Sequence, residues 1–266
     1  MEIYENVPRQ APHRIRTDTL KTMEILAQFR NPADFAPPGD FAAHLARLWP
    51  VVDALSQKDQ RLVEWYLKAD TEEEARLYRM YEGPGIPSTA VLAVLAQRYE
   101  KKMDRPKVFG FWNGHVGEAD RATVKLAIDS KTLPGEIEVA MPRPSESAAG
   151  LGSYADVADV VGAIVSTYNP IYVSVSSREY FPRQVFDDKP GVGWMLYLPK
   201  VLTVQQVPEA RALIPVPEAG RKQTGTIIVS VIDAAFSVDN PEHVEIANRI
   251  EIRLVDQDLL PRYSDI

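Results

Sequence analysis

A change of hydrophobic period near residue 105 is the feature that most constrains the fold of this 266-residue chain. Before it, apolar residues mostly recur every three or four positions, a spacing that predicts helices. After it, apolar and polar residues alternate in stretches such as 107–112 and 123–128, which predicts strands. We therefore expect an α+β fold in which a helical N-terminal region, residues 1–104, packs with a mixed or antiparallel sheet covered by helices, residues 105–266.

The N-terminal region divides into segments at its prolines and glycines. In residues 18–30 the apolar positions follow helical spacing, so we expect a helix there. It should end before Pro32, because the residue before a proline avoids the α conformation. Thr71 followed by Glu74 matches a capping box, and Ser88 is placed to open a further helix. The sequence thus predicts several helices before residue 105.

The C-terminal region alternates between expected strands and helices. Residues 224–232 form its most hydrophobic β-branched run, which predicts a central strand. Residues 154–168 carry apolar side chains at helical spacing, and Asn240 followed by Pro241 is typical of the start of a last helix. These elements indicate a layered arrangement of sheet and helices.

A glycine-containing stretch before residue 154 raises the question of a cofactor site. Gly150, Gly152 and Ala155 match the G-x-G-x-x-A spacing of dinucleotide-binding loops. That fingerprint needs a strand that runs directly into the first glycine, but the expected strand ends near Met141. Ser153 is a good helix N-cap. Two interpretations remain: a plain helix start, or a nucleotide or small-molecule site near Gly150–Ser153 in an α/β enzyme.

The residues that usually carry catalysis are sparse or poorly spaced. The chain has no cysteine, which excludes disulfides, zinc–thiolate sites and cysteine nucleophiles. None of its four histidines is spaced to bind a metal with another. His115 lies with Glu118 and Asp120 in an expected loop, which is either a solvated turn or a contact surface. We expect no catalytic residues, no metal site, no cofactor and no enzymatic activity.

Charge and hydropathy limit the partners of this chain. Its net charge is −7, so it repels nucleic-acid phosphates, and we expect no direct binding to DNA or RNA. No apolar run reaches the length of a membrane span, and the first residues do not form a secretion signal. We therefore expect a cytoplasmic protein with no membrane contact.

Several segments of the C-terminal region together resemble a known family. They are FGFWNG (109–114), YADVADVVGAIVSTYNP (154–170), IYVSVSS (171–177) and GVGWMLYLP (191–199). With these segments the chain resembles immunity family fifty-two of bacterial polymorphic-toxin systems. Within that family it looks most like the immunity proteins paired with type VI secretion DNase effectors. The resemblance implies a non-catalytic antidote encoded beside a toxin with a restriction-endonuclease-like nuclease domain.

The partner that the resemblance implies is a cognate nuclease toxin, whose active site the antidote would occlude. An acidic protein can compete for the basic groove of a nuclease and associate with it rapidly. Acidic and aromatic side chains are the natural candidates for contacts, although Phe181 and Trp194 could equally be core residues. The candidate toxin-binding residues are Glu179, Tyr180, Phe181, Asp187, Asp188, Trp194, His115, Glu118 and Asp120.

Overall fold

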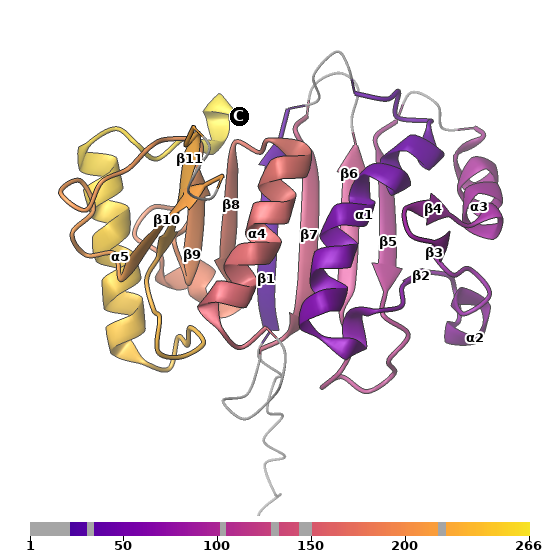
Figure 1. Ribbon diagram of the computed structural model, residues 1–266, viewed down its shortest axis with the longest axis horizontal. Coiled ribbons are helices and arrows are strands. Elements are labelled where there is room, and N and C mark those ends of the chain that lie inside the picture. The colour runs from indigo at the N-terminus through magenta and orange to yellow at the C-terminus, as the bar shows by residue number, and fades with distance from the viewer. Residues whose placement is uncertain (1–21, 31–34, 102–104, 129–132, 144–150, 218–221) are drawn as a thin grey trace, which may run out of the picture.

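A nine-stranded antiparallel sheet forms the centre of the computed structural model (Figure 1). The described residues are 22–30, 35–101, 105–128, 133–143, 151–217 and 222–266. In spatial order the strands are β10 (Ala212–Val216), β11 (Gly225–Val229), β9 (Met195–Leu198), β8 (Tyr172–Ser176), β1 (Thr22–Phe29), β7 (Gly135–Pro142), β6 (Thr123–Ile128), β5 (Lys107–Trp112) and β2 (Tyr66–Leu67). A separate hairpin consists of β3 (Tyr81–Gly83) and β4 (Ile86–Pro87).

Helices cover this sheet unevenly. The α-helices are α1 (Phe41–Lys58), α2 (Glu72–Ala75), α3 (Thr89–Tyr99), α4 (Tyr154–Tyr168) and α5 (Pro241–Asp256), and the 3-10 helices are η1 (Gln60–Leu62), η2 (Arg178–Arg183) and η3 (Tyr263–Asp265). Helices α1 and α4 pack against each other across one face of the sheet, and α5 lies at its β10–β11 end (Figure 1). Among the helices of the described residues, none has the length and apolar character needed to cross a membrane.

The helix expected over residues 18–30 is wrong, because Thr22–Phe29 is strand β1. It lies between β7 and β8 and is hydrogen-bonded to both. Its side chains alternate strictly between buried and half-buried positions. Ala27 completes a buried series with period two, whereas Leu26, which suggested helical spacing, points to the opposite face. Pairing on both sides fixes β1 as a strand, since strand preference depends strongly on tertiary context.

The expected central position of residues 224–232 is also wrong. This run contains β11, which is second from one end of the sheet, and the middle of the sheet belongs to β1. Every residue of Gly225–Val229 is buried. The continuous apolar run therefore reflects cover on both faces, a condition that does not require a central position.

The expected helix starts are confirmed by their hydrogen bonds. Thr71 Oγ1 accepts from the Glu74 backbone N–H at 3.1 Å, and Ser88 Oγ accepts from the Val91 N–H at 3.2 Å. Asn240 caps α5 in the same way. These side chains satisfy N–H groups that have no partner within their own helix.

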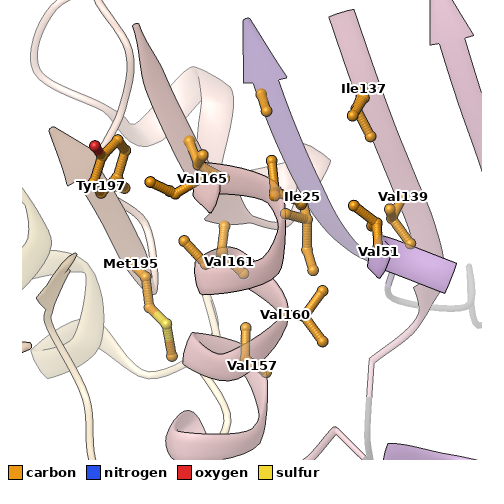
Figure 2. Packing of buried hydrophobic residues seen from close by; sticks show 14 of the residues in the cluster. Ile25, Val51, Ile137, Val139, Val157, Val160, Val161, Val165, Met195 and Tyr197 are labelled. Atoms are coloured by element: carbon orange, nitrogen blue, oxygen red, sulfur yellow. The ribbon is translucent and has the colours of Figure 1, made fainter. Parts of the chain in front are cut away.

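The main core lies between the sheet and helices α1 and α4. Figure 2 shows valines of α4 lying over Ile25 of β1 and Val139 of β7, with Val51 of α1 beside them. These side chains are fully buried, as are Val157 and Val160 of α4. Burial of such side chains stabilises the fold by about 1.5–3 kcal/mol each.

The sheet contains strands from both sides of residue 105. Strands β1 and β2 come from the N-terminal region, and the other seven come from residues 105–266. The domain division into residues 1–104 and 105–266 stays a prediction, but the two regions contribute to one sheet.

Truncation of Phe29 tests the structural role of β1. The ring is fully buried, with the Tyr168 ring centroid 4.8 Å from its own. We expect Phe29→Ala to lower the free energy of unfolding by about 3–5 kcal/mol, because it leaves a cavity beside α4. Urea denaturation measures the change, with Gln28→Ala as the control on the opposite face. Equal effects of the two substitutions would contradict the placement of β1.

Candidate functional site

One face of the sheet is only partly covered, and we call it the open face. It is the side of β1, β7 and β6 directed away from α1 and α4. The cross-strand row Leu26–Glu138–Lys125 lies on it, and its members are half-buried. The neighbouring positions along each strand face the helices and are buried.

Charged side chains on the open face are paired with one another. Lys125 Nζ lies 2.8 Å from Glu136 Oε1 and 2.5 Å from Glu138 Oε2. Arg178 bonds the Glu24 carboxylate and lies 3.4 Å from Glu138 Oε1. Burial raises the pKa of Glu24, and Arg178 opposes that rise. Partly exposed pairs of this kind add little stability, so the network mainly fixes where these side chains lie.

The two predicted contact segments start at the same end of the strands. The last residues of β8 and β5 lie in one row of paired residues across the sheet. The members of this row are Ser176, Glu24, Ala140, Thr123 and Trp112. The first segment, residues 178–188, follows β8, and the second, residues 113–122, follows β5. Four strand spacings of roughly 4.8 Å separate β8 from β5, which places the two segments about 19 Å apart. Pairing through β1, β7 and β6 brings together segments that are distant in sequence.

Glu251 of α5 holds the first segment in place. Its carboxylate is 1% exposed and accepts hydrogen bonds from the Tyr180 hydroxyl at 2.6 Å, the Val185 N–H at 2.8 Å and the Val192 N–H at 2.9 Å. Burial raises the pKa of Glu251, and the three hydrogen bonds oppose that rise. Three donors on one buried carboxylate compensate for its removal from water.

Two of the predicted contact residues are core residues. Tyr180 is 1% exposed and Trp194 is 2% exposed, and the Trp194 indole N–H donates to the Val231 carbonyl at 2.9 Å. Their side chains therefore leave the candidate contact set. Phe181 is the opposite case, because it is 61% exposed and its interpretation as a core residue is wrong.

The predicted acidic residues are on or near the surface, and they differ in their pairing. Asp120 is bonded by Arg61 at 3.0 Å, and Asp188 lies 3.8 Å from Arg262. Within the described part of the chain the other three carboxylates form no ion pair: Glu118, Glu179 and Asp187. His115 is exposed, as is Glu118. Contact of these residues with a partner stays a prediction.

The described part of the glycine-containing stretch leads directly into α4. Gly150 lies outside the described residues, whereas Ser153 Oγ accepts from the Ala155 N–H at 3.2 Å and caps the helix. This is the expected capping arrangement.

Sequence reasoning missed Glu251 and the 3-10 helix η2. A signal for Glu251 was present, because it lies on the buried side of α5 with Ala247, Ile250 and Leu254. A carboxylate among apolar helix positions indicates a buried, hydrogen-bonded group. The donors that it binds come from a segment more than 50 residues earlier, and no local pattern predicts that contact.

Comparison with known proteins identifies the family. The profile of Imm52, immunity protein 52, matches residues 37–262, so the chain belongs to the Imm52 family. It is therefore a non-enzymatic antitoxin of the immunity-protein class. A solved structure described as Pseudomonas aeruginosa T6SS protein PA0821 has a similar fold, with a TM-score of 0.52 and 10% identity. The similarity covers 88% of this chain and 76% of that chain. No curated protein matches the sequence.

Substitution of Glu251 tests its hold on the first segment. In Glu251→Gln the amide group cannot accept all three hydrogen bonds, so we expect a loss of about 1–3 kcal/mol in unfolding free energy. Amide hydrogen exchange at Val185 and Val192 should accelerate. Glu245→Gln on the exposed side of α5 is the matched control and should change stability by less than about 0.5 kcal/mol. Unchanged exchange at both valines would refute this role.

Proposed function

We propose that this protein neutralises a cognate nuclease toxin of a type VI secretion system by binding over the toxin's active site. Membership of the Imm52 family over residues 37–262 is the observation that carries the proposal. The similar fold of a protein described as a T6SS protein supports the secretion-system context. The nuclease class of the toxin rests on the resemblance described from the sequence.

The charge of the protein suits a nuclease partner. A groove that binds DNA is basic, and this chain has a net charge of −7. Glu118 and Asp187 are exposed and have no cation to neutralise them among the described residues, so they are free to meet a basic groove, whereas one carboxylate oxygen of Glu179 is buried. Such complementarity speeds association and would place carboxylates where DNA phosphates otherwise lie.

The geometry of the two segments supports a single contact surface. Both segments, residues 178–188 and 113–122, start at the same end of the strands. Their starts are about 19 Å apart if strands are spaced by roughly 4.8 Å. A typical protein interface buries about 800 Å² on each partner, which is wide enough to include both segments. Phe181 is exposed in the same segment as Asp187, and aromatic side chains commonly carry much of the binding energy. We place the encounter in the cytoplasm, where a DNase finds its substrate.

The proposal is tested with the product of the neighbouring toxin gene. Calorimetric titration should give one-to-one binding, and a DNA-cleavage assay on the same samples should show loss of nuclease activity at equivalence. A toxin that binds and still cleaves DNA would disprove occlusion. A neighbouring gene product with no nuclease activity would disprove the assigned toxin class.

Phe181→Ala tests the predicted anchor of the interface. Removal of the ring should weaken toxin binding about 30-fold, which corresponds to roughly 2 kcal/mol, a usual size for a central aromatic contact. Stability should hardly change, because the ring is exposed. Val204→Ala, at an exposed apolar residue outside both segments, is the control. If the two variants bind equally well, Phe181 is not an anchor.

A further inference from the structure

The connection between β5 and β6, residues 113–122, is an exposed loop on a buried base (Figure 1). Residues 115–121 are all exposed, and the residues on either side of them, Gly114 and Ala122, are buried. Asn113, at the start of the loop, is only 3% exposed although its side chain is polar. A buried polar side chain at this position indicates hydrogen bonds that hold the loop.

The Asn113 side chain joins the two ends of the loop. Its amide N–H groups donate to the Asp120 carbonyl at 2.7 Å and to the Arg61 carbonyl of η1 at 3.1 Å. Its amide oxygen accepts from the Ala122 N–H at 2.8 Å. The Asn113 backbone N–H also donates to the Ala122 carbonyl at 3.1 Å. One buried side chain thus connects the start of the loop to its end and to η1, with both donors on carbonyls and the acceptor on an N–H.

Gly114 fixes the direction in which the chain leaves this base. Its φ of 76° lies in the left-handed region, which favours glycine. A Cβ atom there would lie 2.9 Å from the Tyr66 ring, so a larger residue does not fit without a shift. The Arg76 guanidinium donates to the Gly114 carbonyl at 2.5 Å. The conformation of the loop is therefore fixed at its first two residues.

The end of the loop is also held, and its tip remains free. Arg61 lies 3.0 Å from the Asp120 carboxylate, and the Asp120 N–H donates to the Gly117 carbonyl at 3.0 Å. The tip, residues 115–119, has the sequence HVGEA, in which most side chains are small. Val116 is 57% exposed. A narrow tip of this kind suits a cleft on a partner better than a flat surface.

We propose that Asn113 is a positioning residue for toxin binding, which holds residues 115–119 in the conformation that enters a cleft on the toxin. The identity of the partner as the toxin rests on the proposed antidote function. Because the Asn113 side chain is buried at the base of the loop, it acts through residues 115–119 and does not touch the toxin itself. The basic groove proposed for the toxin is the cleft that this tip would enter, with Glu118 as the acidic contact.

Loss of the Asn113 contacts would weaken binding through its effect on the free protein. A loop that samples many conformations must be ordered on association, and that ordering reduces affinity. The apparent dissociation constant rises in inverse proportion to the fraction of molecules in the competent conformation, so a fall to about one tenth weakens binding about tenfold. A change in loop mobility and a change in affinity should therefore occur together.

The free protein tests whether Asn113 fixes the loop. Backbone ¹⁵N order parameters of residues 115–119 should be about 0.85 in the wild type and fall below about 0.6 in Asn113→Ala. Asn113→Asp is the second variant, because it keeps the size of the side chain and the acceptor for the Ala122 N–H but cannot donate to either carbonyl. Thr226→Val is the matched control, since Thr226 is 1% exposed and forms three side-chain hydrogen bonds on β11. It should leave the order parameters of the loop unchanged.

Titration with the product of the neighbouring toxin gene tests the role in binding. Asn113→Ala and Thr226→Val should lower the urea midpoint of unfolding by similar amounts, roughly 0.5–1 M, because each removes three buried hydrogen bonds. Of these two variants, only Asn113→Ala should weaken toxin binding, by about tenfold. Val116→Ala shortens a side chain at the tip and should weaken binding roughly fivefold with the order parameters unchanged.

Order parameters that stay at about 0.85 in both Asn113 variants would overturn the assignment of Asn113. Equal toxin affinity of Asn113→Ala and Thr226→Val would overturn it as well, because lost stability alone would then account for any change. Wild-type affinity of Val116→Ala would show that the tip does not enter the toxin. Failure of the wild-type protein to bind the toxin would instead refute the antidote function, whereas the order parameters would still decide whether Asn113 fixes the loop.

Discussion

The insertion of β1 between β7 and β8 is the contact on which the rest of the structure depends. It joins a four-stranded group on the β8 side to a four-stranded group on the β7 side by backbone hydrogen bonds. Without it, β7 and β8 would present unpaired backbone groups. The spacing of the two candidate contact segments depends on β1, because β1 lies between the strands from which they start. The ion pair between Glu24 and Arg178 depends on β1 as well, because Glu24 is a residue of this strand.

Glu251 has a corresponding role for one of those segments. A single buried carboxylate takes hydrogen bonds from a side chain and two backbone amides and so orders residues 180–192 against α5. Phe181 and Asp187 remain exposed on this fixed support. A binding surface that is ordered before the partner arrives loses less entropy on association, which suits an antidote that must act quickly on a toxin.

Local patterns predicted the elements that carry their own signals. Capping side chains marked the starts of α4 and α5, and alternation marked β5 and β6. Phe181 and Trp194 could not be separated from sequence, since exposure depends on what packs over each ring. The helix predicted over residues 18–30 was wrong for the same reason. Leu26 interrupts the alternation of apolar and polar residues, and the strands that pair with β1 lie more than 100 residues later.

The central claim is that the toxin docks at the end of the strands from which residues 178–188 and 113–122 start, next to the open face. Hydrogen–deuterium exchange of this chain, free and bound to its toxin, tests the claim most directly. We expect binding to slow amide exchange in both segments and to leave α1 and α4 unchanged. Slower exchange confined to α1 and α4, with both segments unaffected, would contradict it.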